Sequence, residues 1–474
     1  MEVLLVNPSR MKPAVAPIGL DYLADPLVAR GHSVDLLDLC FEADPRTAVA
    51  VRLRGSQPGL IGVSLRNTDD CYFASQECFL PHYRDVVAWL KEGIDAPVVV
   101  GGVGYSVMPE AVLRRVGADL GVAGDGEWAI ADLADRLAAG QPVEDVAGLL
   151  FRRSGRVHRN PPRPGPMGEL PRRRSLVDNA RYFREGGQGG IETKRGCGQR
   201  CVYCADPIAK GREWRTRSPR LVADEVEALL AQGVDCLHLC DAEFNLPRWH
   251  AEAVCKELAD RGLDERVRWY AYLSPQPFDR KLASLMRRAG CVGVNFGADS
   301  GDDGSLAGLG RPYRVDGLRQ TAQACREQGL VFMFDLLIGG PGETPETLAR
   351  TIDLMRELQP DRVGASVGVR VYPGTRLARR VQAEGFSRDN PSLHGSLEGN
   401  ADLAEPVYFV SPALGPTPVE TVRRLVAGDQ HFFVGGAPGE TDANYNYNDN
   451  SVLVEAIRRG HRGAYWDILR AISG

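Results

Sequence analysis

Short apolar runs alternate with amphipathic segments along two separate stretches of the chain. In the first stretch, residues 1–145, the apolar runs lie at positions 2–6, 33–39, 59–65, 97–102 and 119–124. Runs of this kind, separated by helical patterns, are typical of parallel strands joined by crossover helices. The alternation therefore predicts an α/β fold that begins with a doubly wound, Rossmann-like domain.

Polar residues and glycines follow the predicted strands of this first domain. Because ligands bind at the carboxyl ends of the strands in such sheets, we expect these residues to form a ligand site. They are Asn7, Arg66, Asn67, Gly101, Gly102, Gly124, Gly126 and Glu127. The turn after the first run, "NPSRMKPAVAPIG", contains neither GxGxxG nor GK[ST], so a nucleotide phosphate cradle is not predicted.

The second stretch, residues 189–375, repeats the alternation. Its apolar runs lie at 189–193, 236–240, 268–273, 291–297, 331–337 and 363–370. Six βα units predict a partial (β/α)6 TIM barrel, whose chemistry lies at the carboxyl ends of the strands.

Two regions outside these stretches lack the alternation. Residues 146–188 are rich in proline and arginine, which predicts a solvated interdomain linker. Residues 376–474 predict a small α+β region that caps the barrel mouth. Its aromatic side chains suit a planar or apolar substrate and are Tyr445, Tyr447, Tyr465 and Trp466.

Three cysteines, Cys197, Cys201 and Cys204, lie within eight residues in the stretch "RGCGQRCVYC". A structural zinc site needs four ligands, and His238 and Cys240 are the near candidates for a fourth. A thioredoxin-like role would use only the CxxC pair. The remaining option is a cubane iron–sulfur cluster held by three thiolates, with one iron open to an exogenous ligand.

Composition narrows the compartment and the partners. The 474 residues contain no apolar run of the ~18 residues that a membrane span needs, and the chain begins with a strand pattern instead of a signal peptide. We therefore expect a cytoplasmic protein with reduced thiols and no membrane contact. The net charge of -5 gives no reason to expect nucleic acid. Cys71 and Cys78 receive no assignment.

"CGQRCVYC" resembles the signature of the radical S-adenosylmethionine (SAM) superfamily. The segments "LLVNPS", "VVVGGVGYSVMPEAVL" and "GVAGDGEWAIADL" resemble the cobalamin-binding domain of cobalamin-dependent radical SAM enzymes. About 370 residues match that family, including its tryptophan methylase group. The resemblance implies a 4Fe-4S cluster on the three cysteines, and SAM and cobalamin as further cofactors. It implies SAM contacts from "LCDAEFNLP" and "GADSGDD", with the candidates Asp241, Glu243, Asn245, Asp299 and Ser300.

Many corrinoid proteins supply a histidine to cobalt from an Asp-x-His-x-x-Gly motif, and this motif does not occur here. Arg66 is placed where a residue can lie beneath the corrin. A guanidinium has no lone pair, so it would block cobalt instead of binding it. We take Arg66 as the candidate catalytic residue. The alternative is an ion pair between Arg66 and Asp69, Asp70 or another acid.

The resemblance implies methyl transfer to carbon on a small-molecule substrate, in specialised-metabolite (antibiotic) biosynthesis, with methylcobalamin as methyl carrier. Hydrogen abstraction by a 5′-deoxyadenosyl radical and direct attack by an electron-rich aromatic both remain open. An external electron donor of flavodoxin or ferredoxin type is expected. Two alternatives stand: a cobalamin-dependent radical rearrangement, ring contraction or cyclisation without methyl transfer, and a zinc-stapled binding protein.

Overall fold

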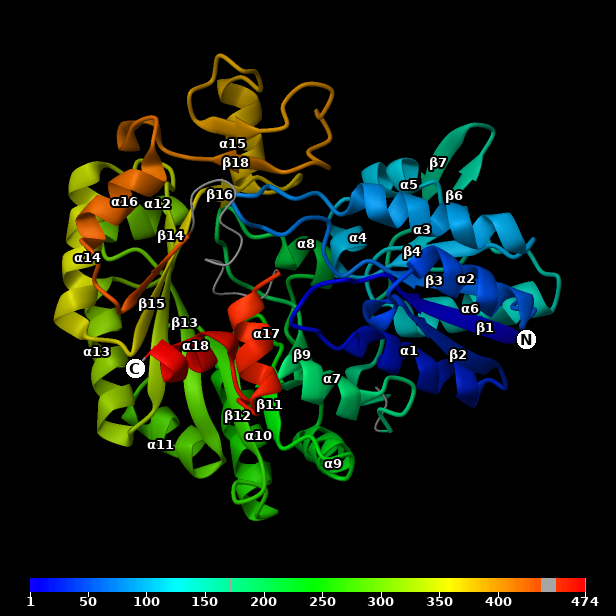
Figure 1. Ribbon diagram of the computed structural model, residues 1–474, viewed down its shortest axis with the longest axis horizontal. Coiled ribbons are helices and arrows are strands. Elements are labelled where there is room, and N and C mark those ends of the chain that lie inside the picture. The colour runs from blue at the N-terminus through cyan, green and yellow to red at the C-terminus, as the bar shows by residue number, and fades with distance from the viewer. Residues whose placement is uncertain (170–172, 436–448, 474) are drawn as a thin grey trace.

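The computed structural model describes residues 1–169, 173–435 and 449–473, and two large sheets dominate it (Figure 1). The first sheet has the strand order β2-β1-β3-β4-β5-β6-β7. Its parallel strands are β1 (Glu2–Asn7), β2 (Ser33–Asp38), β3 (Leu60–Ser64), β4 (Val98–Gly101) and β5 (Leu120–Val122). The order reverses between β1 and β3, which places the switch point of the doubly wound sheet there.

Both faces of this sheet are buried. Leu4 and Val6 of β1 pack in one apolar cluster, whereas Val3 and Leu5 pack in another on the opposite face. This alternation follows from the two-residue period of a strand, and the neighbouring strands and covering helices supply the rest of each cluster. The helices are α1 (Ile18–Ala29), α2 (Pro45–Arg54), α3 (Leu80–Gly93), α4 (Val103–Val107), α5 (Pro109–Val116) and α6 (Gly126–Ala138).

The second sheet has the order β19-β15-β14-β13-β12-β11-β8, with every neighbouring pair parallel. Six of its strands lie on the six predicted apolar runs, so the partial barrel is confirmed. The seventh, β19, comes from the C-terminal region. The strands are β8 (Gly189–Ile191), β11 (Cys236–Leu239), β12 (Arg268–Leu273), β13 (Cys291–Asp299), β14 (Val331–Ile338), β15 (Arg362–Val367) and β19 (Phe432–Val434).

Helices cover the outside of the barrel strands, and one apolar cluster joins the two layers. These helices are α9 (Pro219–Leu230), α10 (Arg248–Asp260), α11 (Arg280–Arg288), α12 (Asp303–Leu309), α13 (Val315–Gln328), α14 (Pro345–Leu358) and α16 (Pro418–Val426). Short elements near the cysteines are β9 (Lys194–Arg195), α8 (Asp206–Lys210) and β10 (Arg215–Thr216). Among the described helices, none is long and apolar enough to cross a membrane.

Besides α16 and β19, which join the barrel, the C-terminal region contributes to two further parts. A small antiparallel sheet of order β16-β18-β17 packs with helix α15. Two further helices, α17 and α18, lie beside the strands of the second sheet (red in Figure 1). Trp466 of α18 contacts Tyr270 of β12 edge-on, with ring centroids 6.2 Å apart. The elements are α15 (Arg376–Glu384), β16 (Val369–Arg370), β17 (Leu393–Gly395), β18 (Val407–Phe409), α17 (Ser451–Arg458) and α18 (Tyr465–Ser473).

The segment 146–188 differs from the solvated linker that its composition predicts. Its first part forms a hairpin of β6 (Leu149–Arg153) and β7 (Arg156–Arg159), and β6 pairs antiparallel with β5. Leu149 and Leu150 are fully buried in this pairing. Its last part forms α7 (Asn179–Gly186). The composition did not reveal this strand because only Leu149 and Leu150 are buried in it. Its other stabilising contacts are backbone hydrogen bonds to the edge of the sheet, which require no apolar pattern in the sequence.

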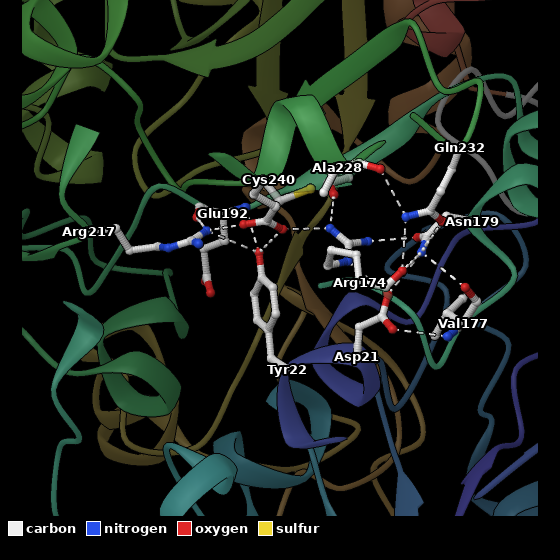
Figure 2. A network of polar contacts seen from close by, with 12 residues as sticks. Asp21, Tyr22, Arg174, Val177, Asn179, Glu192, Arg217, Ala228, Gln232 and Cys240 are labelled. Carbon is white, nitrogen blue, oxygen red and sulfur yellow. Dashed lines mark hydrogen bonds and ion pairs between the residues drawn. The ribbon is translucent and has the colours of Figure 1, made fainter. Parts of the chain in front are cut away.

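A buried polar network joins this segment to both domains (Figure 2). Arg174 donates to Asp21 of α1 at 2.8 Å and to Glu225 of α9 at 2.7 Å, and all three side chains are fully buried. Tyr22 donates to the same Glu225 carboxylate at 2.9 Å, and Arg217 pairs with it as well. The network therefore fixes the first domain against the barrel.

Candidate active site

A cavity of about 450 Å³ lies between the first domain and the barrel. All eight ligand-site residues predicted for the first domain line it: Asn7, Arg66, Asn67, Gly101, Gly102, Gly124, Gly126 and Glu127. They meet because parallel strands present their carboxyl ends at one edge of the sheet. The prediction that these residues share one site is thus consistent with the geometry, while their contacts to a cofactor remain a prediction.

Two of the glycines are required by the backbone itself. Gly102 has a φ of 101°, and a Cβ there would lie 2.7 Å from the Leu65 carbonyl oxygen. Gly124 has a φ of 91°, and a Cβ there would approach Pro162 to 3.0 Å. Only glycine adopts such angles without strain. A side chain at either position would collide with Leu65 or Pro162, so glycine is required by the close packing of the chain here.

Two of the predicted polar residues have protein partners. The Asn7 amide donates to Asp38 at 2.9 Å and to Tyr182 at 2.8 Å. The Glu127 carboxylate accepts two bonds from Arg195 of β9, at 2.6 and 3.0 Å. Their side chains therefore shape the cavity wall and join the domains.

Arg66 lies on the first domain's side of the cavity, near the barrel residue Cys240. Burial raises the pKa of the Cys240 thiol, and the Arg66 charge opposes that rise. Of the two acids considered as its ion-pair partners, Asp69 is bound by Arg370 at 2.9 Å. Among the described residues of the first domain that line the cavity, there is no histidine.

On the barrel's side of the cavity, Tyr465 and Trp466 were named from the sequence and both line it, whereas the strand residues were not predicted as a ligand site. Tyr445 and Tyr447 lie outside the described residues. This side of the cavity is formed by side chains that point inward from successive strands and from α18, namely His238, Tyr272, Asn295, Met333 and Trp466. The signal was present: single polar residues interrupt the apolar strands "CLHLC", "RWYAYL" and "CVGVNFG". Such residues at buried strand positions mark an interior face that is lined for a ligand.

A second cavity, of about 300 Å³, lies at the carboxyl ends of the barrel strands. Glu243 and Asp299 line it, as expected, together with Tyr203 and Arg311. Arg311 donates to Asp299 at 2.5 and 3.0 Å, and Tyr203 donates to it at 2.7 Å. Burial raises the pKa of Glu243 to about 7. Tyr272 lines both cavities and stands between them.

Three other predicted SAM contacts have structural partners. The Asp241 carboxylate accepts bonds from the Thr193 and Lys194 backbone amides, at 2.8 and 3.2 Å. The Asn245 side chain bonds at both ends to the backbone of Ser274, at 2.8 and 2.9 Å.

Ser300 lies 3.2 Å from the Thr351 hydroxyl and accepts from the Asp302 amide. Asp241, Asn245 and Ser300 thus hold neighbouring loops, and a contact between them and SAM stays a prediction. Sequence position places them at strand ends, but it does not determine the direction of the side chains.

Cys197, Cys201 and Cys204 lie on the loop after β9. The loop is held by backbone bonds from Cys197 to Gly211 and from Val202 to Leu309, at 3.1 and 2.9 Å. Burial raises the pKa of all three thiols, that of Cys201 to about 11. Thiolates are the ligands of iron–sulfur clusters. Among the described residues, no three Cys, His, Asp or Glu side chains lie close enough together to hold a metal ion as they stand.

Cys71 and Cys78 belong to the loop after β3. The Cys71 sulfur lies 3.0 Å from the Tyr372 hydroxyl, and the backbone at Cys78 pairs with Asp69. Phe73 of the same loop packs edge-on against Tyr408 with centroids 5.6 Å apart. The loop thus anchors the first domain to the small C-terminal sheet.

The buried His238 side chain predicts a specific pH dependence of stability. Burial lowers its pKa to about 4. Between pH 4 and 6.5 the unfolded chain binds this proton and the folded chain does not, so stability rises with pH in that window. Replacing His238 with leucine is expected to remove about 2 kcal/mol of the loss between pH 6.5 and 5. Urea unfolding at both pH values checks this, and identical pH dependence in the two proteins would contradict it.

Comparisons with known proteins identify both domains. The model of the radical SAM superfamily matches residues 191–355, and that of the B12 binding domain matches residues 9–134. Tryptophan 2-C-methyltransferase of Streptomyces laurentii is 32% identical, and the alignment covers 98% of this chain and 95% of that protein.

Solved structures extend the likeness to the whole fold. A radical SAM methyltransferase from Kitasatospora setae, solved with tryptophan and a SAM analogue, has a TM-score of 0.92 at 32% identity, covering 100% of this chain and 98% of the other. A cobalamin-dependent SAM radical enzyme has a TM-score of 0.71 at 18% identity, covering 86% of this chain and 64% of the other, and is alike in fold alone. The chain therefore belongs to the cobalamin-dependent radical SAM family and, within it, to the methyltransferases.

Proposed function

We propose that this enzyme methylates a ring carbon of tryptophan, with SAM as the methyl source. The observation that carries the proposal is the shared cavity: it joins the carboxyl edge of the first sheet to a barrel interior lined by His238, Tyr272 and Trp466. Aromatic side chains on the barrel's side of this cavity suit a planar indole. In the net reaction the ring carbon gains a methyl group and loses a proton, and SAM becomes S-adenosylhomocysteine.

The residues present fit the cofactors of the family. The glycine-lined edge of the first sheet would hold cobalamin, which supplies a cobalt centre that carries the methyl group. The three cysteines would hold a 4Fe-4S cluster, which supplies an iron open to an exogenous ligand. Glu243 and Asp299 would then face SAM, whose ammonium group is a partner for carboxylate oxygens. The zinc-stapled binding protein is set aside because the family assignment accounts for all three cysteines.

Arg66 is the residue through which the first domain would act on cobalt. Because a guanidinium offers no lone pair, Arg66 would offer no ligand atom to the cobalt of a bound cobalamin. Replacing Arg66 with alanine is expected to change the visible absorption spectrum of bound cobalamin and to slow methyl transfer by about tenfold or more. Arg66→Lys, which keeps the charge, is the matched comparison. An alanine variant with unchanged spectrum and unchanged turnover would contradict this role.

The proposed function is tested with anaerobically reconstituted enzyme, tryptophan and SAM labelled in its methyl group. Labelled methyltryptophan and a matching amount of S-adenosylhomocysteine are the expected products. A rearranged or cyclised product with no label would favour the alternative radical chemistry. Replacing the chemical reductant with a flavodoxin or ferredoxin tests the expected electron donor.

A cytoplasmic location and a role in antibiotic biosynthesis remain predictions.

A further inference from the structure

We propose that Nε2 of His238 accepts a hydrogen bond from an N–H group of the substrate, and that this bond determines specificity for indole. This inference rests on the proposed function. His238 lies on β11, where its register partners are Tyr270 of β12 and Gly190 of β8. Its neighbours Leu237 and Leu239 point to the opposite face of the strand, and His238 lines the shared cavity.

The contact of the other ring nitrogen fixes the tautomer. Nδ1 of His238 lies 3.1 Å from the backbone carbonyl oxygen of Leu239. A carbonyl oxygen can only accept, so Nδ1 carries the proton and donates it. In a neutral imidazole the second nitrogen then holds a lone pair. Burial lowers the pKa of His238 to about 4, so the ring is neutral at physiological pH.

The lone pair of Nε2 has access to the cavity. Nδ1 of His250 is sealed in the protein without a partner, whereas neither nitrogen of His238 is sealed in this way. The His238 ring is within hydrogen-bond distance of the Leu239 carbonyl and packs against the Tyr272 ring, whose centroid lies 4.7 Å away. The Tyr272 ring could stack on an indole in the cavity, and Nε2 of His238 could then accept a hydrogen bond from the indole N–H.

A ligand that lacks the N–H would leave this buried acceptor without a partner. Sites built to bond a substrate N–H reject analogues that lack it far more strongly than sites that differ by one methylene. We therefore expect the substitution of His238 to change mainly the ratio of kcat/KM between substrates with and without the ring N–H.

The test varies residue 238 of the enzyme and the ring N–H of the substrate, separately and together. Dissociation constants and kcat/KM are measured for tryptophan and for its benzothiophene analogue, in which sulfur replaces the ring N–H. The wild-type enzyme is expected to prefer tryptophan by about 10- to 100-fold, and His238→Leu to bring this preference close to one. His238→Gln, which keeps an acceptor, is expected to restore part of it. Met333→Leu changes the same cavity without a polar atom and should keep the wild-type preference.

The outcomes separate the two proposals. If the wild-type enzyme neither binds nor methylates tryptophan, the proposed function fails, and the inference fails with it. If it methylates tryptophan but His238→Leu keeps the full preference, the inference alone is overturned. It is overturned as well if the substitution changes the absorption spectrum of bound cobalamin and leaves the preference intact, because His238 would then act on cobalt.

Discussion

Replacing Cys201 with alanine is expected to abolish methyl transfer and to leave a protein that cannot retain its cluster. Even a change in a group that only orients a metal ligand lowers metal affinity by about 10- to 100-fold, and loss of a direct thiolate ligand costs more. Cys201 shares one loop with Cys197 and Cys204, and burial raises the pKa of all three thiols. Without iron, the two remaining thiols would stay protonated and would bind little metal.

The measurement is iron content and visible absorption after anaerobic reconstitution, followed by product analysis. Cys78→Ser is the matched control, because it removes a thiol from the loop after β3, outside the cysteine loop. The control is expected to retain its iron. A Cys201→Ala protein with wild-type iron content and turnover would show that this cysteine is not a ligand.

Replacing Arg174 with alanine is expected to lower the free energy of unfolding by about 3–5 kcal/mol, the cost of removing one partner from a buried ion pair. The change leaves the Asp21 and Glu225 carboxylates without the cation that bridges them, and neither is exposed to water. Because these acids lie on α1 and α9, the loss falls on the contact between the two domains. We expect differential scanning calorimetry to show a lower melting temperature and a separation of the domain transitions.

Arg30→Ala supplies the control for this result. Arg30 pairs with Asp135 at 2.9 Å, nearly the distance of the Arg174 pair, but the two side chains are 39% and 44% exposed. An exposed pair of this kind contributes at most about 1 kcal/mol. Equal effects of the two substitutions would mean that the buried network does not hold the domains together.

Much of the fold follows from local pattern. Each predicted strand of the first domain and of the barrel is found, because apolar runs that alternate with helical segments are typical of strands in a parallel sheet. The composition of the segment 146–188 misleads because β6 gains its stability by pairing with β5, a contact that leaves no period in the sequence. The strand β19 comes from residues far along the chain for the same reason.

The site residues, too, include some that could be predicted from the sequence and some that could not. The first domain's cavity residues could be predicted because strand ends share one edge, which topology alone ensures. The expected SAM contacts Asp241 and Asn245 were harder to judge, because their side chains turn toward the Thr193 and Ser274 backbones. Whether a polar side chain binds a ligand or a neighbouring loop depends on which backbone groups lie within reach, and this is a property of the packed chain.

By itself, the sequence determined the two-domain α/β plan, the three-cysteine loop and the family that both imply. These depend on periodicity and on short spacings, which local physical chemistry constrains. Only the tertiary structure decided that the two domains enclose one cavity, that a fully buried Arg174 fixes them together, and that His238 faces that cavity with an open lone pair. Those features arise from contacts between residues far apart in the chain, and such contacts form only when the sheets pack against each other.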